Sequence, residues 1–309
     1  MAGSSKKVII AALIGNSLVA ITKFFAAAVS GSAAMLSEGI HSVVDTGNQV
    51  LLLYGLKRSK RPPDERFPFG YGKEVYFWSF VVAIMIFALG GGISIYEGVE
   101  HLLHPRPVET SFLNYIVLVL AMLFEGAALY FALNEFRRVK GKWGYIEAVQ
   151  RGKDPSLFVV LFEDSAAMLG LFAAFVGVLL SDLTGNPLYD GCASILIGLL
   201  LAGTAAWLAY ETKGLLIGES AQQPVADEIK RLVREEAGVE HLNEVLTLHM
   251  GPEFIVANIS VDFEDAIGAV EMEQLIARID RKIKRVLPQV KRVFVEAEAR
   301  RQLIPEESC

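Results

Sequence analysis

Six stretches of the chain are long enough and apolar enough to cross a lipid bilayer as helices: 8–29, 33–54, 76–96, 114–136, 156–180 and 188–210. The hydrocarbon core needs about 20 residues of helix. Apolar residues make up 53% of the 309 and charged ones only 21%, whereas soluble chains carry roughly 25% charged residues. We therefore predict an α-helical membrane protein with a six-helix transmembrane domain over residues 1–217.

The charge balance and the motifs exclude several functional classes. The formal net charge is −6, so the chain lacks the cationic field that holds nucleic acid. Motifs of the HExxH, GxSxG and P-loop types are missing, which argues against a membrane protease, a lipid hydrolase or an ATP-driven pump. We expect neither an enzyme nor a bound cofactor.

The basic residues of the loops predict how the helices are oriented. Fourteen Lys and Arg residues lie before the first stretch and in the loops 2–3 and 4–5, whereas the opposite loops hold only Arg106. Basic loops stay on the cytoplasmic side. Both termini are therefore expected in the cytoplasm or an equivalent compartment. No presequence precedes Val8, which favours a bacterial plasma membrane over an organelle.

Residues 218–309 have the pattern of a small soluble α+β domain. Helical patterns cover 225–237 and 271–287, strand patterns cover 244–248 and 254–263, and a last strand begins at 293. The order α-β-β-α-β suits an open sheet of the ferredoxin-like kind, with its helices on one face. Its core is modest, and such units often gain stability by pairing with a copy, so we expect a dimerisation domain.

The second stretch carries Glu38, His41, Asp45 and Asn48 along one helical stripe. An ionisable side chain at this depth costs a few kcal/mol, roughly, and indicates a functional site by default. The imidazole of His41 and the carboxylate of Asp45 lie four residues apart and can chelate one cation, a combination that suits zinc. The alternative is a packing patch in which His41 is hydrogen-bonded to Asp45.

Other acidic residues lie in the fourth and fifth stretches. Glu163 and Asp164 are adjacent and diverge by about 100° on a helix, so only one of them is expected to meet the stripe. For Glu163 the alternative is an ion pair with Lys23 of the first stretch. Glu125 of the fourth stretch either lines the pathway or bonds to a neighbouring helix.

His41, Asp45 and Asp164 together supply three ligands of a tetrahedral metal site. Asn48, Glu163 or water remain as candidates for the fourth position. These groups bind metal only when deprotonated, so protons compete with the metal for the same atoms. The competition provides a physical basis for antiport of metal and protons.

Several strings make the chain resemble the cation diffusion facilitator family over almost its whole length. The most specific are SEGIHSVVDTGNQ at 37–49, FGYGK at 69–73 and EDSAA at 163–167. With GKDP at 152–155 and TGNP at 184–187, the chain is most similar to the branch that contains zinc transporter nine. The resemblance implies a homodimer of six-helix protomers that exchange a divalent cation for protons by alternating access.

The family's central site takes two ligands from the second helix and two from the fifth, each pair spaced i, i+4. His41, Asp45 and Asp164 match three of these positions, and the fourth falls on Val160, which cannot bind metal. The resemblance thus makes Glu163 the natural substitute.

Two accessory metal sites of relatives are expected to be missing or weak. Near Asp64, Phe67 and Tyr71 stand where histidines would help to bind a second ion. In the tail, the counterparts of the bridging ligands are Asn243, Asn258, Glu296 and Glu298.

Our leading hypothesis is proton-coupled export of a divalent cation, foremost Zn²⁺, through a lipid bilayer. The imidazole favours zinc over harder ions such as manganese. The alternative is a non-transporting metal receptor or scaffold that signals through its cytoplasmic domain. Transport of an organic cation is a third hypothesis, disfavoured because aromatic caging residues are missing near Asp45.

Overall fold

The computed structural model describes residues 2–30, 33–104 and 112–300. Within its helices, the side chains of residues 2–5, 26–27, 29–30, 33–41 and 113–114 lie outside the description. The chain divides into two compact units. The helical unit comprises residues 1–62 and 73–213, and the C-terminal unit comprises residues 63–72 and 214–309.

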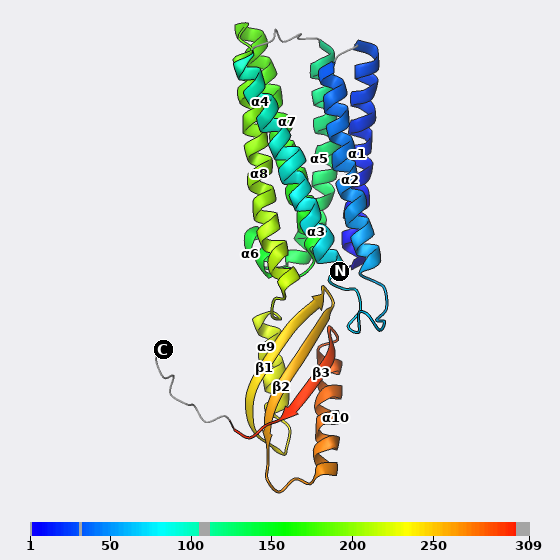
Figure 1. Cartoon of the computed structure of the whole chain (residues 1–309), viewed down its shortest axis with the longest axis vertical. Helices are drawn as coiled ribbons and strands as arrows, with labels where there is room; N and C mark the ends of the chain where they lie inside the picture. Colours follow the sequence, from blue (N-terminus) through cyan, green and yellow to red (C-terminus); the bar gives the residue numbers. More distant parts are fainter. Residues whose placement is uncertain (1, 31–32, 105–111, 301–309) are drawn as a thin grey trace, which may run out of the picture. The chain divides into compact units, whose positions relative to one another are not determined.

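The helical unit contains a long helix at each of the six predicted stretches (Figure 1). Five are continuous: α1 (Ala2–Ser30), α2 (Ala33–Arg58), α5 (Phe112–Lys140), α7 (Pro155–Thr184) and α8 (Leu188–Ile217). The third stretch is built from α3 (Glu74–Met85), the π-helix η1 (Ile86–Gly92) and α4 (Ile93–Leu103). Helix α1 packs against α2 and α5, while α5 packs against α7. The expectation of a helical membrane domain is confirmed.

Helix α2 differs from the other long helices in composition. Among the described residues, five helical spans are both long enough and apolar enough to cross a membrane, in α1, α3–α4, α5, α7 and α8. Helix α2 is 26 residues long, and in its sequence polar residues from Glu38 to Gln49 interrupt the apolar ones. The helix that departs most from a lipid-facing composition is thus the one that carries the predicted ligand stripe.

Glycines bring η1 and α4 into close contact with α8. A Cβ atom added to Gly91 would lie 2.9 Å from the Cβ atom of Ala202, and one added to Gly98 would lie 2.8 Å from the carbonyl oxygen of Gly191. Small residues let membrane helices approach closely. Gly91 therefore has a packing role, and it lies in the segment with π-helical hydrogen bonding.

A short helix, α6 (Tyr145–Arg151), precedes α7 and was not predicted. Asp154 then caps α7, because its carboxylate accepts a hydrogen bond from the backbone N–H of Ser156 at 3.2 Å. Pro155 occupies the first turn, where its missing N–H costs nothing. The start of α7 is therefore set by a local signal that places Glu163 and Asp164 more than two turns inside the helix.

The C-terminal unit has the predicted order of elements: α9 (Gln223–Arg234), β1 (Val239–Gly251), β2 (Phe254–Phe263), α10 (Ala269–Val286) and β3 (Val290–Ala297). The sheet order is β1-β2-β3, with β1 antiparallel and β3 parallel to β2. Strand β1 is longer than its predicted core at 244–248, because pairing with β2 extends it across polar positions that carry no strand pattern.

Both helices of this unit cover the same face of the sheet. The alternate residues Ile255, Ala257, Ile259 and Val261 of β2 are fully buried with the apolar sides of α9 and α10. The opposite face leaves Leu246 and Phe294 about half exposed, at 55% and 49%. The domain therefore buries one layer of core and leaves one face of its sheet uncovered in the single chain.

Candidate functional site

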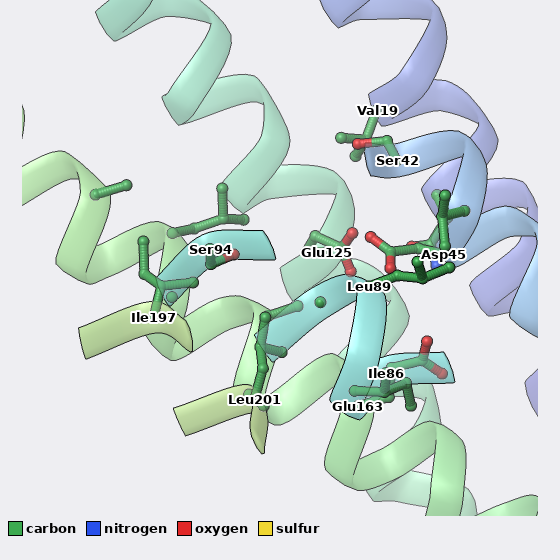
Figure 2. Close-up of a pocket in the computed structure, with 18 of the residues that line it drawn as sticks. Val19, Ser42, Asp45, Ile86, Leu89, Ser94, Glu125, Glu163, Ile197 and Leu201 are labelled. Carbon is green, nitrogen blue, oxygen red and sulfur yellow. The ribbon is translucent and has the colours of Figure 1, made fainter. Parts of the chain in front are cut away.

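A cavity of about 220 Å³ lies among the helices of the helical unit (Figure 2). Its walls come from α1, α2, α5, α7, α8 and the η1–α4 segment. Apolar side chains such as Leu89, Ile197 and Leu201 form one part of the wall. Charged side chains form another, which gives the cavity an apolar body with polar groups on particular helices.

The cavity gathers carboxylic acids from four different helices. The acidic lining residues are Asp45 of α2, Glu97 of α4, Glu125 of α5, and Glu163 and Asp164 of α7. Lys23 of α1 is the one basic side chain among the lining residues. Like charges held together at low dielectric repel each other strongly, and their burial is costly. An arrangement of this kind favours the entry of cations.

Asp45 and Asp164 both line the cavity, as two of the predicted ligands should. Asp164 is 1% exposed, and its Oδ2 atom has no hydrogen-bond partner among the described residues. Asp45 is half-buried. The structure thus brings the second and fifth predicted spans together at these two residues.

Glu163 also borders the cavity, but its carboxylate is held by α2. The Nδ2 atom of Asn48 donates to Oε1 at 3.1 Å, and the Nε2 atom of Gln49 donates to Oε2 at 2.8 Å. The Lys23 ammonium, the alternative partner considered for Glu163, donates to Ser42 Oγ at 3.0 Å. Glu163 joins α7 to α2 in this conformation.

Asn48 is buried and lies beside Glu163 rather than on the cavity wall. Gln49, which the sequence analysis did not single out, is fully buried and makes the shorter of the two bonds to Glu163. Its position four residues after Asp45 was the signal that could have found it, since i and i+4 lie on one helix face.

His41 lies in α2, one helical turn before Asp45, and its side chain falls outside the described residues. Val160, at the fourth position implied by the family, is fully buried and does not line the cavity. Among the side chains that the structure describes, no three His, Cys, Asp or Glu residues gather closely enough to hold a metal ion. The described acids surround the cavity without converging.

The loop carrying Asp64 belongs to the C-terminal unit. The hydroxyl of Tyr71 donates to Asp64 Oδ2 at 2.6 Å, and the backbone N–H of Phe67 donates to Oδ1 at 2.7 Å. These two bonds hold the pKa of Asp64 below its ordinary value. The carboxylate thus organises the turn of this loop.

The acidic residues considered in the tail bond across strands. Asn258 donates to Glu296 at 3.2 Å, and Ser260 donates to Glu298 at 2.6 Å. Asn243 donates to Ser260 Oγ at 3.1 Å and so extends the network to β1. These side chains link all three strands.

Comparison with known proteins finds a match to the cation efflux transmembrane domain over residues 9–217. The chain is 38% identical over 264 residues to the proton-coupled zinc antiporter SLC30A9, mitochondrial, of Xenopus laevis, covering 84% of this chain and 47% of the relative. For the Homo sapiens protein of that name the identity is 37%, covering 84% and 46%. Metal tolerance protein C4 of Arabidopsis thaliana is 32% identical over 280 residues, covering 90% and 61%. The chain spans about half the length of these zinc antiporters.

These similarities confirm the resemblance to the zinc transporter nine branch and correct one expectation. The expected bacterial plasma membrane is wrong, because the SLC30A9 relatives are mitochondrial proteins. That expectation rested on the residues before Val8 alone. The apolar length of a helix reports the thickness of a bilayer and does not identify the membrane.

Proposed function

The chain belongs to the cation efflux family, and from that premise we propose that it exchanges Zn²⁺ for protons across its membrane by alternating access. The family membership makes it a transporter of cations rather than an enzyme, in agreement with the missing hydrolase and ATPase motifs. The observation that carries the proposal is the cavity walled by carboxylic acids from α2, α4, α5 and α7.

Asp45, Asp164 and His41 hold the cation in this proposal. Asp45 of α2 and Asp164 of α7 line the cavity, and His41 lies on α2 one helical turn before Asp45. Two carboxylates and an imidazole form a borderline ligand set that suits Zn²⁺. The relatives whose names specify zinc antiport support this choice of cargo.

Protons drive release because they compete for the same oxygen and nitrogen atoms. A carboxylate or an imidazole coordinates a metal only in its deprotonated form. Protons arriving from the opposite side therefore displace Zn²⁺, and metal arriving from the side of the basic loops displaces protons. In this proposal the helices shift when the ion binds, so that the acids around the cavity converge on it.

We also propose that the protein works as a homodimer. The sheet of the C-terminal unit exposes Leu246 and Phe294 on the face that α9 and α10 leave uncovered. Burying apolar area of this kind against a second copy is favourable by about 25 cal/mol per Å².

Zinc flux in proteoliposomes under an imposed pH gradient tests the function. We expect Asp45→Asn and Asp164→Asn to reduce the flux at least about tenfold, since even outer-shell partners of a metal cost 10–100-fold. Asp182→Asn is the matched control, because Asp182 lies on the same helix as Asp164, is exposed and does not line the cavity. Full flux in both site variants would refute the assignment. Zinc binding by wild-type protein without any flux would instead favour the receptor hypothesis.

A further inference from the structure

The proposed ligands leave one position of a tetrahedral zinc site to be filled. Val160, which occupies the family's fourth position, is an apolar side chain buried away from the cavity. The sequence left Glu163, Asn48 and water as candidates. The hydrogen bonds in the structure show which of these protein groups already have partners.

Glu163 and Asn48 are hydrogen-bonded to each other. Both oxygens of Glu163 accept hydrogen bonds from side-chain amides of α2. If Glu163 turned to a cation, two buried amide groups would lose their acceptor, and each unsatisfied buried group costs about 1–3 kcal/mol. Asn48 directs its Nδ2 atom to Glu163 and is not among the cavity-lining residues.

Glu125 of α5 combines two properties that neither of these residues combines, since Glu163 lines the cavity with both oxygens bonded and Asn48 keeps an Oδ1 without a partner among the described residues away from the cavity lining. Glu125 lines the cavity, is 7% exposed, and its Oε2 atom finds no hydrogen-bond partner within the described part of the chain. Figure 2 shows the Glu125 and Asp45 side chains extending toward each other from α5 and α2. A carboxylate kept at this depth with an unsatisfied oxygen is expensive unless a cation or a proton joins it.

The neighbouring charges place Glu125 within the same electrostatic group as the proposed ligands. Asp45 and Lys23 are close enough for their charges to act on Glu125, and Glu125 in turn acts on Asp164. Lys23 donates to Ser42 on α2, so the ammonium group lies at the α1–α2 side of the cavity. A divalent cation between Asp45, Asp164 and Glu125 would relieve the repulsion among the three acids.

We propose that Glu125 supplies the fourth ligand of the transported cation, in place of Val160, Glu163 or Asn48. The inference rests on the proposed function. The site then takes groups from α2, α5 and α7, with one imidazole and three carboxylates. Three helices must converge to close it, so α5 takes part in binding the ion.

The test measures Zn²⁺ binding by the purified full chain, and Zn²⁺ flux in proteoliposomes, for Glu125→Gln. Gln keeps the volume and removes the anionic ligand. We expect binding and flux to fall at least about tenfold, as for other losses around a metal site. Glu135→Gln is the matched control, since Glu135 is an acid on the same helix as Glu125 and does not line the cavity.

A second variant separates a ligand from a structural residue. Glu125→His offers a nitrogen ligand at the same position, and the visible absorption of bound Co²⁺ reports the atoms around the metal. We expect Glu125→His to retain binding and to change the Co²⁺ spectrum. The proposal would be overturned if Glu125→Gln lost binding, Glu125→His did not restore it, and the Co²⁺ spectrum of the remaining complex were unchanged.

The two proposals fail in different ways. If Glu125→Gln binds and transports like wild type while Asp45→Asn does neither, Glu125 is not a ligand and the proposed function stands. If Asp45→Asn also leaves flux intact, the proposed site itself is wrong.

Discussion

The two units of the protein treat their charged residues in opposite ways. In the helical unit, Asp164 and Glu125 are buried beside a cavity, and each keeps an oxygen atom without a hydrogen bond from the described residues. In the C-terminal unit, Arg231 pairs with Glu228 and Glu235 on the exposed side of α9. Both units are rich in acids, and among the described residues the buried carboxyl oxygens without a partner belong to the helical unit.

This difference shows that the free-energy cost of unpaired buried acids falls on the helical unit, which contains the proposed transport site. An exposed ion pair contributes about 0–1 kcal/mol, so the C-terminal unit gains little from its pairs and risks little by losing one. A carboxyl group at bilayer depth costs several times more. The helical unit is therefore expected to give up stability for its acids, and four substitutions test that contrast.

The largest expected effect is the loss of transport in Asp164→Leu together with a gain in stability. Removing the carboxylate should lower zinc flux at least about tenfold. Removing an unpaired buried carboxylate removes its desolvation cost, which is roughly several kcal/mol, so stability should rise. Thermal unfolding in detergent and flux in proteoliposomes measure the two effects. A lower unfolding temperature would show that Asp164 is a structural residue.

The next effect belongs to helix packing and involves no charge. Gly91→Ala places a Cβ atom 2.9 Å from the Cβ atom of Ala202, and overpacking of this kind costs about 1–3 kcal/mol. Thermal unfolding in detergent should therefore occur at a lower temperature. Gly92→Ala is the control in the same segment, because its nearest neighbour would be the Phe87 carbonyl oxygen at 3.7 Å. Equal unfolding temperatures for both variants would contradict close η1–α8 packing.

A smaller effect is expected for Glu236→Gln in the C-terminal unit. Glu236 accepts a hydrogen bond from Lys282 Nζ at 2.7 Å and raises the pKa of Lys282. The loss should be at most about 1 kcal/mol. The pair stabilises below the unfolded lysine pKa of about 10.4, and its contribution is lost as the pH rises through the folded value. Chemical denaturation at neutral pH and above about pH 11 measures it; an equal difference at both values would contradict the assignment.

The smallest effect is expected for Tyr71→Phe, which removes a hydrogen bond from Asp64. The pKa of Asp64 should rise toward its ordinary value, because the Tyr71 hydroxyl is the main cause of the lowering. Since the folded pKa lies below the unfolded one, the bond stabilises above about pH 4 and is lost as the pH falls through the folded pKa. Carboxyl ¹³C NMR follows the titration. An unchanged pKa would show that the Phe67 N–H bond suffices.

The sequence predicted the elements that depend on local pattern. Long helices lie at the six stretches predicted from apolar length, and the strand at Phe254–Phe263 follows from its alternation. The π-helical segment at Ile86–Gly92 was not predicted. Ala202 of α8 lies close to this segment, and no pattern within the segment reveals that neighbour. The extension of β1 likewise depends on its partner strand.

For the candidate site, the sequence predicted the cost of each buried acid and left its neighbours open. It placed Asp45 and Asp164 on spans that had to meet, and the structure brings both to one cavity. It could not decide which of the adjacent Glu163 and Asp164 would meet the amides of α2, or whether Glu125 lines the pathway. Those outcomes depend on the rotation of each helix about its axis.

By itself, the amino-acid sequence predicted six apolar stretches of membrane-spanning length, several acids within them, and an α+β domain that follows. Each of these follows from the transfer energy or the periodicity of a single segment. The tertiary structure alone decided that Glu163 is held by Asn48 and Gln49, and that Glu125 shares a cavity with Asp45 and Asp164. The reason is physical: a segment carries its own hydrophobicity, whereas the partner of a buried side chain is set by how the other helices pack around it.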